Sequence, residues 1–573
     1  MGKVISIGKQ DFASLRENDY FFIDKTKFIK EWWDNADDIT LITRPRRFGK
    51  TLNMSMLDCF FSTTCSDRGD LFEGLSVWED ERYRKLQGTY PVIFLSFADV
   101  KANNYKDART SIFLIINEVY QNFRFITETD ALSDEEKSFF PLMNAHAKGL
   151  IKEEVSDALI YRSLKDLCNY MTRYFGKKTI ILLDEYDTPV QEAYLYGYYS
   201  EFISFIRNLF NSTFKTNPYL ERAVMTGITR VSKESIFSDL NNLRVVTTTS
   251  DMYADCFGFT EEEVFAALDD FDMGDRKEIV KKWYDGFTFG EHRDIYNPWS
   301  ITNYLKEKKL RPYWASTSSN GLVGQLIRTA SSDVKEKMED LLNNREIAVG
   351  FDEQIVFNQL DSNENAIWSL LLASGYLKVE DIDYYGITLE PLYKLKITNL
   401  ETISMFSNMF RSWFENSEAS YGRFVKSLMQ GDIDAMNYYM KRMALATFSY
   451  FDVGNGNDES EEPERFYHGF VLGIMADQAE NYEIRSNRES GFGRYDIMMI
   501  PHDYAKYYAI IIEFKVCSRS KKESLEDTVH SALKQIEDKN YDAELISLGI
   551  PKERIRHYGF AFEGKKVLIG DKI

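Results

Sequence analysis

Short apolar runs recur along the first part of the chain, and helical patterns separate them. Four such runs lie at residues 39–43, 90–97, 180–183 and 222–230. Between them, apolar residues recur with helical spacing over 51–61 and over about 104–175. Strands that alternate with helices are typical of a parallel sheet covered by helices. We therefore predict an α/β fold in which residues 1–250 form a domain built on a parallel sheet.

The pattern changes after residue 250. In 251–320, Thr260 precedes Glu261, Glu262 and Glu263 as a helix cap, and aromatic turns follow, so we expect a small helical lid. These aromatic residues either contact a ligand or only hold the turns together. Residues 321–452 are mostly helical with a hairpin, in the order of a winged-helix-like module. Such modules bind DNA or couple domains, and the lack of a basic recognition helix here favours coupling.

Residues 453–464 contain Gly, Asn and acids without an apolar anchor, so we predict a linker there. Residues 465–573 return to a mixed pattern. A helix comes first, a Gly-containing turn leads into a strand that ends near residue 500, and a second strand covers 507–516. A helix over 524–539 follows. This order predicts a separate C-terminal α/β domain.

Composition narrows the setting. A chain of 573 residues is too long for one core, and 44% hydrophobic with 28% charged residues is ordinary for a globular protein. The five cysteines form no CxxC pair, which argues against a zinc site or disulfide framework and favours a reducing cytoplasm. No apolar run reaches the length of a membrane helix. The net charge of −20 excludes general coating of nucleic acid but allows a local basic channel.

The residues after the first strand, Arg-Pro-Arg-Arg-Phe-Gly-Lys-Thr at 44–51, have the form of a phosphate-binding P-loop. Gly49 lets the backbone approach a phosphate, Lys50 would reach the β- and γ-phosphates, and Thr51 would bind Mg²⁺. The full motif has glycine where this chain has Arg44. The candidate nucleotide-binding residues of this loop are Arg46, Arg47, Phe48, Gly49, Lys50, Thr51 and Leu52.

The third apolar run ends in Asp184 and Glu185, the pattern of a Walker B strand. Because ligands bind at the carboxyl ends of parallel strands, Asp184 would hold Mg²⁺ and Glu185 would act on the attacking water. Thr226, at the end of the next strand, is a candidate sensor of the γ-phosphate. Arg230 either stabilises the transition state or forms a structural ion pair.

The C-terminal domain carries a second candidate site. Glu513 and Lys515 alternate on one face of a strand, and Asp496 lies on the strand before it. Two carboxylates with a lysine suit metal-assisted hydrolysis of a phosphodiester, with Asp496 and Glu513 binding Mg²⁺ and Lys515 stabilising charge. Gln535 would face the same edge. A plain ion pair between Glu513 and Lys515 is the simpler alternative.

Residues 5–320 resemble the predicted AAA-ATPase-like family found in many bacterial proteins. The resemblance rests on residues 22–26 (FIDKT), 44–51 (RPRRFGKT), 183–187 (LDEYD), 226–230 (TGITR) and 235–243 (SIFSDLNNL). In this family the first P-loop glycine is typically replaced, so Arg44 is expected. The resemblance implies a P-loop fold that binds ATP.

Residues 464–573 resemble the PD-(D/E)XK nuclease superfamily, in the branch that commonly follows this ATPase family. The matching stretches are 464–470, 491–496, 513–515 and 532–536. All the acids and the lysine of the motif are present, which argues against a degenerate copy. An acid of the first helix often assists the metal in this superfamily, and Glu464 and His468 are the candidates here.

Together these features favour a cytoplasmic enzyme that uses ATP and Mg²⁺, with Mn²⁺ as an alternative at the nuclease site. ATP would control cleavage of nucleic acid, with DNA favoured over RNA, and bacterial defence or mobile elements are roles suggested by analogy. One alternative is an ATP-driven signalling or assembly switch whose nuclease-like domain only binds. Another keeps the ATPase active and the nuclease fold structural. A homo-oligomer would let Arg46, Arg47 or Arg230 act across a subunit boundary.

Overall fold

The structure is a computed structural model that describes residues 3–230, 236–237, 240–315, 321–351, 363–412, 418–451, 470–474, 478–490, 493–517, 523–563 and 566–571. The chain divides into two compact units. Unit 1 comprises Met1–Ser318, Val349–Leu392 and Thr398–Glu401, and unit 2 comprises Ser319–Ala348, Tyr393–Ile397 and Thr402–Ile573. The expected linker at 453–464, Glu464 and His468 lie outside the described residues.

Unit 1 is built on a parallel sheet of five strands in the order β2-β3-β4-β1-β5. The strands are β1 (Ile39–Thr43), β2 (Val92–Ser96), β3 (Thr179–Asp184), β4 (Leu220–Gly227) and β5 (Leu243–Val246). Strands β1 and β3 are buried along their whole length, which explains why both are continuous apolar or β-branched runs. The predicted parallel sheet is confirmed.

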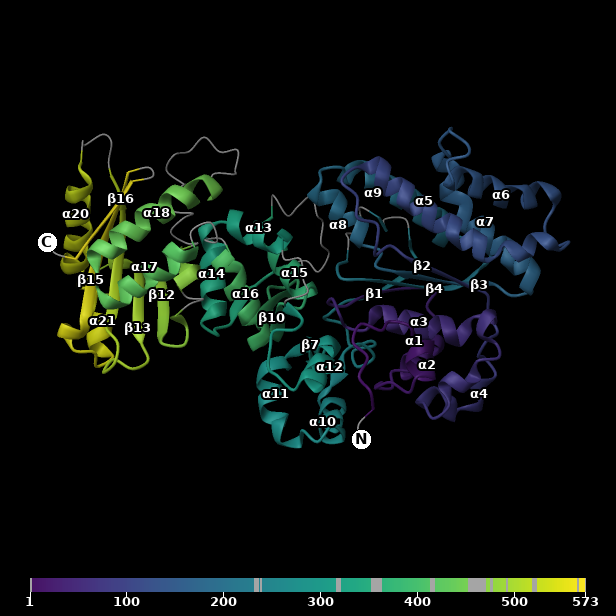
Figure 1. Cartoon of the computed structure of the whole chain (residues 1–573), viewed down its shortest axis with the longest axis horizontal. Coiled ribbons are helices and arrows are strands. Elements are labelled where there is room, and N and C mark those ends of the chain that lie inside the picture. Colours follow the sequence, from purple (N-terminus) through teal and green to yellow (C-terminus); the bar gives the residue numbers. More distant parts are fainter. Residues whose placement is uncertain are drawn as a thin grey trace. The chain divides into compact units, whose positions relative to one another are not determined.

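Helices cover both faces of this sheet (Figure 1). One face carries α1 (Phe12–Glu17), α2 (Lys27–Asn35), α3 (Lys50–Phe61) and α4 (Glu81–Arg84). The other carries α5 (Tyr105–Asn122), α6 (Asp134–Ala147), α7 (Asp157–Phe175), α8 (Thr188–Leu195) and α9 (Tyr199–Phe214). An aromatic cluster that includes Phe28, Trp32, Phe60 and Phe61 fills the core on the α3 side.

The region expected to be a lid contains a small sheet as well as helices. Strands β6 (Phe259–Thr260), β8 (His292–Tyr296) and β7 (Phe287–Phe289) pair in that order. They join α10 (Glu261–Asp270), α11 (Lys277–Tyr284) and α12 (Pro298–Glu307) around an apolar core. Thr260 and Glu263 form the capping box that the acidic helix start predicts.

The next part of the chain is mostly helical and contains one long hairpin. Its helices are α13 (Gly321–Thr329), α14 (Ser332–Leu342), α15 (Ala366–Ala373), α16 (Leu400–Ser412), α17 (Glu418–Gln430) and α18 (Ile433–Phe451). The hairpin strands β10 (Leu377–Tyr385) and β11 (Glu390–Ile397) form a sheet with β9 (Ile347–Val349), in the order β10-β11-β9.

The C-terminal domain is a mixed five-stranded sheet in the order β12-β13-β14-β15-β16. The strands are β12 (Tyr482–Ser490), β13 (Gly493–Pro501), β14 (Ala509–Val516), β15 (Ile555–Glu563) and β16 (Lys566–Gly570). Only β14 and β15 run parallel, and the other neighbours are antiparallel. Helices α20 (Leu525–Asp538) and α21 (Asp542–Ser547) share an apolar core with β13, β14 and β15. The predicted α/β fold of this domain is confirmed.

The close packing of α20 on β15 depends on Gly559. A Cβ at this position would lie 2.8 Å from the Val529 carbonyl oxygen and 3.2 Å from the Ala532 Cβ, both on α20. The only residue that fits without moving the helix is therefore glycine. This contact also fixes the height of α20 above Glu513, which pairs with Gly559 across the parallel strands.

We expect Gly559→Ala to lower the free energy of unfolding of the chain by about 1–3 kcal/mol, because α20 must shift. Gly422→Ala is the matched control, since nothing lies within 4 Å of a Cβ there and Gly422 is inside helix α17. That substitution should leave stability unchanged or raise it by up to about 1 kcal/mol. Urea unfolding of both variants measures the difference, and equal stability would contradict this packing.

Candidate active sites: a phosphate loop and a carboxylate pair

The loop between β1 and α3 has the backbone shape of a phosphate cradle. Gly49 is the N-cap of α3, with φ of 78° and ψ of 13°, a left-handed conformation that glycine adopts without strain. Helix α3 begins directly after it at Lys50. The first N–H groups of a helix are free to bind an anion, so a phosphate fits against this end.

Arg44, at the position where the full motif has glycine, is a structural residue. Its side chain is fully buried and donates to the carbonyl oxygens of Thr43 at 2.9 Å and Thr247 at 2.7 Å. Its guanidinium also lies 4.5 Å from the centre of the Phe289 ring. Burial lowers the pKa of Arg44 to about 9. The arginine therefore ties the loop to the segment after β5 instead of leaving room for a turn.

The middle of the loop is held from the lid side. The Asn297 side chain donates to the carbonyl oxygen of Arg46 at 3.3 Å, while its own oxygen caps the start of α12. The Arg47 guanidinium lies 4.3 Å from the centre of the Trp299 ring. Phe48 is buried against lid strand β7, and the centre of its ring lies 4.7 Å from the centre of the Phe287 ring.

These contacts show where the predicted nucleotide-binding residues lie. The ring of Phe48 packs against Phe287 and Phe289 of the lid, and the side chain of Leu52 is half-buried against the core beside α3. Arg46 is half-buried and Arg47 is exposed. Among the loop residues, Lys50 and Thr51 are the ones whose side chains interact with the acids at the end of β3.

Lys50 is buried at the start of α3. Its ammonium group donates to the carbonyl oxygens of Arg44 and Pro45, both at 2.9 Å. Burial lowers the pKa of Lys50, and the nearby charges of Glu185, Asp184 and Asp187 oppose that shift. The lysine is therefore a buried donor inside the loop, beside acids at the ends of the strands.

Asp184, at the end of β3, is surrounded by hydroxyl groups. It accepts from Thr51 Oγ1 at 2.6 Å and from Thr226 Oγ1, so helix α3 and strands β3 and β4 each contribute to one cluster. Burial raises the pKa of Asp184, and the two hydroxyl donors and Lys50 lower it. A carboxylate beside a threonine hydroxyl is the oxygen donor set that Mg²⁺ prefers, so these residues fit the ion.

Glu185 has a left-handed backbone, with φ of 52°. An L-residue other than Gly, Asn or Asp is seldom found there, and such strain is typical of functional sites. Its carboxylate accepts from Thr188 Oγ1 at 3.0 Å. The strained backbone therefore turns Glu185 away from the strand direction, and Thr188 fixes where its carboxylate points.

Asp187 is a site residue that the sequence analysis missed. It is buried and accepts from the backbone N–H of Ile228 at 3.0 Å and from both the N–H and the hydroxyl of Thr229 at 2.8 Å. It thereby fixes the chain that leads from Thr226 to Arg230, which is half-buried. A second acid shortly after the Asp-Glu pair was the available signal.

The second site lies on β13 and β14 in unit 2. Ile497 pairs with Ile512, and continuing this antiparallel register brings Asp496 beside Glu513. The backbone N–H of Phe514 donates to Asp496 Oδ2 at 2.6 Å. The predicted neighbourhood of the two acids is thus present, on the face that α20 covers.

Glu513 has one carboxylate oxygen in need of a partner. The residue is 4% exposed, and its Oε1 accepts from Gln535 on α20. Its Oε2 is buried and has no hydrogen-bond partner among the described residues. Burial and then the charge of Asp496 raise the pKa of Glu513 to about 8, while Lys515 and Gln535 oppose that rise. A divalent cation would satisfy this oxygen, so the site fits Mg²⁺ or Mn²⁺.

Two further side chains complete this site. Lys515 is half-buried on the same face of β14 as Glu513, because side chains two residues apart point to the same side. Gln535 also donates to the hydroxyl of the buried Tyr541 at 3.1 Å. Tyr541 was not foreseen, since nothing in its local sequence marks it. The four residues predicted for this site are therefore brought together around one buried acid.

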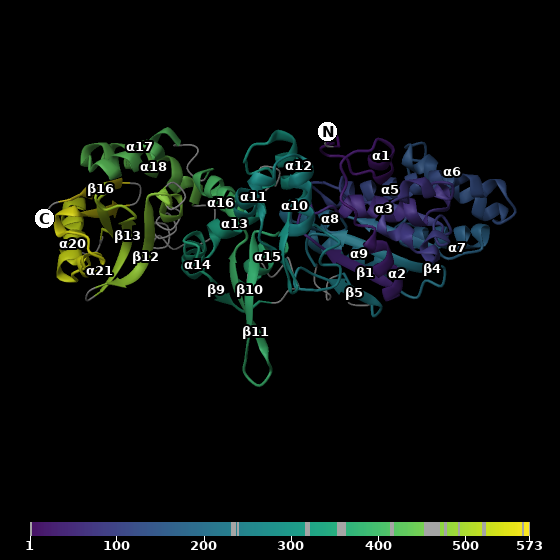
Figure 2. The same cartoon turned by 90° about the horizontal axis from the view of Figure 1, so that it is seen from below.

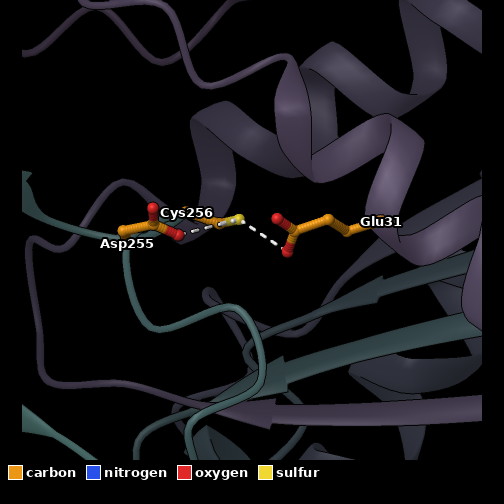
Figure 3. Close-up of side chains that lie close together, drawn as sticks. All are labelled: Glu31, Asp255 and Cys256. Carbon is orange, nitrogen blue, oxygen red and sulfur yellow. Dashed lines mark hydrogen bonds between the residues drawn. The ribbon is translucent and has the colours of Figure 1, made fainter. Parts of the chain in front are cut away.

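A third group of potential ligands does not form a convincing metal centre. Glu31, Asp255 and Cys256 lie close together (Figure 3), and the Cys256 thiol donates to Glu31 at 3.5 Å. Lys27 already lies 2.5 Å from Asp255 and 3.3 Å from Glu31. Burial raises the pKa of Cys256 well above its ordinary value, so the thiol keeps its proton. Lysine supplies the positive charge here.

Fold and site geometry together fit a P-loop domain in unit 1 and a C-terminal domain of nuclease-type fold. Residues 6–237 match the family described as predicted AAA-ATPase, and residues 462–572 match the PD-(D/E)XK nuclease superfamily. The two matches agree with the fold of each domain, and they cover the N-terminal and the C-terminal part of the chain separately.

A similar protein is known from Azotobacter chroococcum mcd 1. It is described as an uncharacterized protein in the vnfD 5' region, and it is 24% identical over 559 residues. The similarity covers 96% of this chain and 95% of that protein, so the two share their whole length and not one domain alone.

Arg44→Gly would restore the glycine of the full motif, and we expect it to destabilise the protein. The substitution removes the donors to Thr43 and Thr247 and leaves a cavity, at a cost of about 2–5 kcal/mol in the free energy of unfolding. Arg47→Gly is the control: it loses only an exposed contact with Trp299, worth about 0.5–1 kcal/mol, and glycine adopts the φ of 66° more easily. Equal urea midpoints for the two variants would contradict a structural role for Arg44.

The pKa of Glu513 predicts how metal binding depends on pH. Below pH about 8 the folded protein carries a proton on Glu513, and a cation must displace it. We therefore expect Mn²⁺ affinity at this site to rise about tenfold per pH unit from pH 6 to 8 and to level off above 8. In the metal-free protein, the free energy of unfolding should fall as the pH rises from 6 to 8. The reason is that the unfolded chain releases this proton at lower pH than the folded protein does.

Calorimetric titration of Mn²⁺ without nucleotide, in buffers of different ionisation enthalpy, measures the affinity and the proton released. Glu513→Gln should lose the pH-dependent part of the Mn²⁺ affinity. Any Mn²⁺ binding in unit 1 should be unchanged in this variant. A pH dependence identical in wild type and variant would show that another group titrates.

Proposed function

We propose that unit 1 binds ATP with Mg²⁺ and hydrolyses it, and that the C-terminal domain cleaves phosphodiester bonds of nucleic acid with Mg²⁺ or Mn²⁺. ATP binding or hydrolysis would control the cleavage. The observation that carries the nuclease proposal is the buried Oε2 of Glu513, which has no hydrogen-bond partner among the described residues and lies beside a second acid.

In unit 1, each residue has a role that suits its position. Lys50 would exchange its bonds to the loop carbonyls for phosphate oxygens, and the N–H groups after Gly49 would bind the same anion. Thr51 and Asp184 would hold Mg²⁺, and Glu185 would orient the attacking water. Thr226 would report on the γ-phosphate through Asp184, and Arg230 would stabilise the developing charge.

In the C-terminal domain, Asp496 and Glu513 would bind the cation together with the scissile phosphate. Lys515 would stabilise the charge that develops on the phosphate, or position the water. Gln535 and Tyr541 would keep Glu513 in place. Replacing the proton on Glu513 by a cation removes the cost of burying this carboxylate, so binding of metal and correct ionisation go together.

The setting follows from coarser features. The superfamily of the C-terminal domain points to a nucleic-acid substrate, and we favour DNA over RNA. None of the described helices is both long and apolar enough to cross a membrane. All five cysteines are free, which suits a reducing compartment such as the cytoplasm. A role in bacterial defence or mobile-element biology is the context in which such a pair of activities would be useful.

We expect Lys515→Ala and Asp496→Ala to lower cleavage at least about 100-fold while ATP hydrolysis stays within about twofold of wild type. Lys50→Ala should lower ATP hydrolysis by a similar factor and remove the ATP-dependent part of cleavage. The assay is a panel of single- and double-stranded DNA and RNA with Mg²⁺ or Mn²⁺, with and without ATP. Lys534→Ala, an exposed lysine of α20, is the control.

Each alternative gives a distinct result. No cleavage of any substrate, with ATP still hydrolysed, would favour the ATP-driven switch or a structural nuclease fold over the proposal. Cleavage that is unaffected by Lys50→Ala and by ATP would keep the nuclease and reject control by ATP. Cleavage that survives Asp496→Ala and Lys515→Ala would reject the assigned site.

A further inference from the structure

The far end of the β10–β11 hairpin exposes large apolar side chains. Tyr384 is 63% exposed, Tyr385 51%, Ile387 103% and Leu389 67%. Figure 2 shows the two strands leaving unit 1 as a narrow arm that ends in this turn. We call Tyr384, Tyr385, Ile387 and Leu389 the hairpin tip. Four large apolar side chains exposed within six residues are more than isolated surface positions usually show.

The backbone of the hairpin tip is well defined. Gly386 and Leu389 have φ of 69° and 53°, and the N–H of Leu389 donates to the carbonyl oxygen of Gly386 at 3.4 Å. The Thr388 hydroxyl donates to Glu390 at 3.2 Å. A turn with fixed geometry loses little conformational freedom when it binds, so the tip is preorganised for a contact.

The charges around the tip define what it can approach. The end of the hairpin, residues 381–390, contains Asp381, Asp383 and Glu390 and neither Lys nor Arg, while nearer its base Lys378 pairs with Glu380 at 3.0 Å. The acidic end of the hairpin is repelled by nucleic-acid phosphates and by anionic membranes. The tip therefore fits an apolar protein surface that is bordered by positive charge.

Unit 1 itself has such a surface on the lid. Lys282, Lys306, Lys308, Lys309 and Arg311 are all exposed, and we call them the lid cations. Helix α11 and the segment after α12 are held together by a bond from the Tyr284 hydroxyl to the carbonyl oxygen of Arg311 at 2.9 Å. Among the described residues, the four lysines make no ion pair within 4 Å, and Arg311 pairs with Glu307 at 3.6 Å.

Apolar side chains lie among these cations. Trp283, Leu310 and Tyr313 are half-buried and pack on the lid core, so each keeps part of its surface outside. This gives the lid cations the apolar floor that the hairpin tip requires. In a chain with net charge −20, four exposed lysines that make no ion pair among the described residues favour a partner of opposite charge.

We propose that the hairpin tip of one chain docks on the lid cations of a second copy. Both surfaces belong to unit 1, and Figure 2 shows the tip and helices α11 and α12 on opposite sides of it, so one chain cannot join its own two surfaces. Contact between different patches of two identical chains is head-to-tail, and each added copy leaves one tip and one lid surface open. The lid of every inner copy would thus be contacted by its neighbour.

The test is the state of association of the purified, nucleic-acid-free chain, measured by sedimentation velocity over a wide concentration series. Wild type should associate as concentration rises. Ile387→Ser with Leu389→Asn removes the apolar tip, and Lys306→Glu with Lys309→Glu reverses the lid charge. Each pair should weaken association at least tenfold. The controls are Leu150→Ser, at a residue that is 76% exposed, and Lys148→Glu with Lys152→Glu.

Two further results distinguish head-to-tail contact from other arrangements. Mixing the tip variant with the lid variant should restore a dimer but nothing larger, because only one intact pair of surfaces remains. Adding Asp381→Lys and Asp383→Lys to the lid variant should restore association through the reversed charge pair. Melting temperatures of all variants confirm that they fold.

Several outcomes would overturn the proposal. Wild type that stays monomeric at every concentration, or association that the tip variant does not weaken, excludes the second copy as the occupant. A lid variant that loses binding of a labelled oligonucleotide but associates normally would assign the lid cations to phosphate. None of these measurements depends on ATP hydrolysis or cleavage, so failure here is separate from failure of the proposed function.

Discussion

Both candidate sites depend on the cost of burying a carboxylate. In unit 1, Asp184 is buried at the end of a central strand, where two threonine hydroxyls and a lysine offset the loss of water. In the C-terminal domain, Glu513 is buried, Gln535 and the backbone of Asp496 stabilise its charged form, and its Oε2 has no hydrogen-bond partner among the described residues. Asp184 is therefore hydrogen-bonded by side chains of its own domain, whereas Glu513 needs a proton or a cation to satisfy its second oxygen. Burial raises the pKa of both Asp184 and Glu513. Of these two acids, only Glu513 also has an oxygen without a hydrogen-bond partner among the described residues.

The phosphate loop is held from two directions. Arg44 ties its start to the segment after β5, and the lid holds its middle through Asn297, Trp299 and the aromatic residues around Phe48. Asn297 does two things at once, because the same side chain caps α12 and binds the loop carbonyl of Arg46. A change in the loop on phosphate binding would therefore reach the lid directly through these contacts.

Four strands of the parallel sheet and the places of the acids along the chain were largely predictable from the sequence, while the spatial order of the strands and β5 were not. An apolar run that ends in acids predicted β3 with Asp184, and the alternation of Glu513 and Lys515 on one face predicted β14. Both signals are local in the sequence. What could not be predicted depends on tertiary contacts. Arg44 departs from the full P-loop motif, and its partner Thr247 is far away in the chain, as are the partners of Asp187 and Asn297. Tyr541 contacts Gln535 six positions before it, but only the folded domain shows that this pair supports Glu513. The roles of all these residues in chemistry stay predictions, since position alone does not establish them.

The order of the strands in the first sheet has a consequence for how the protein is made. Strand β1, which leads into the phosphate loop, pairs only with β4 and β5 within the sheet, and both are synthesised about 180 to 200 residues later. Until then an apolar strand near the start of the chain has both edges open. The chain must keep this segment from pairing with other molecules during translation, and a ribosome that stalls before β4 leaves a fragment that carries the complete loop sequence but has no sheet to support it.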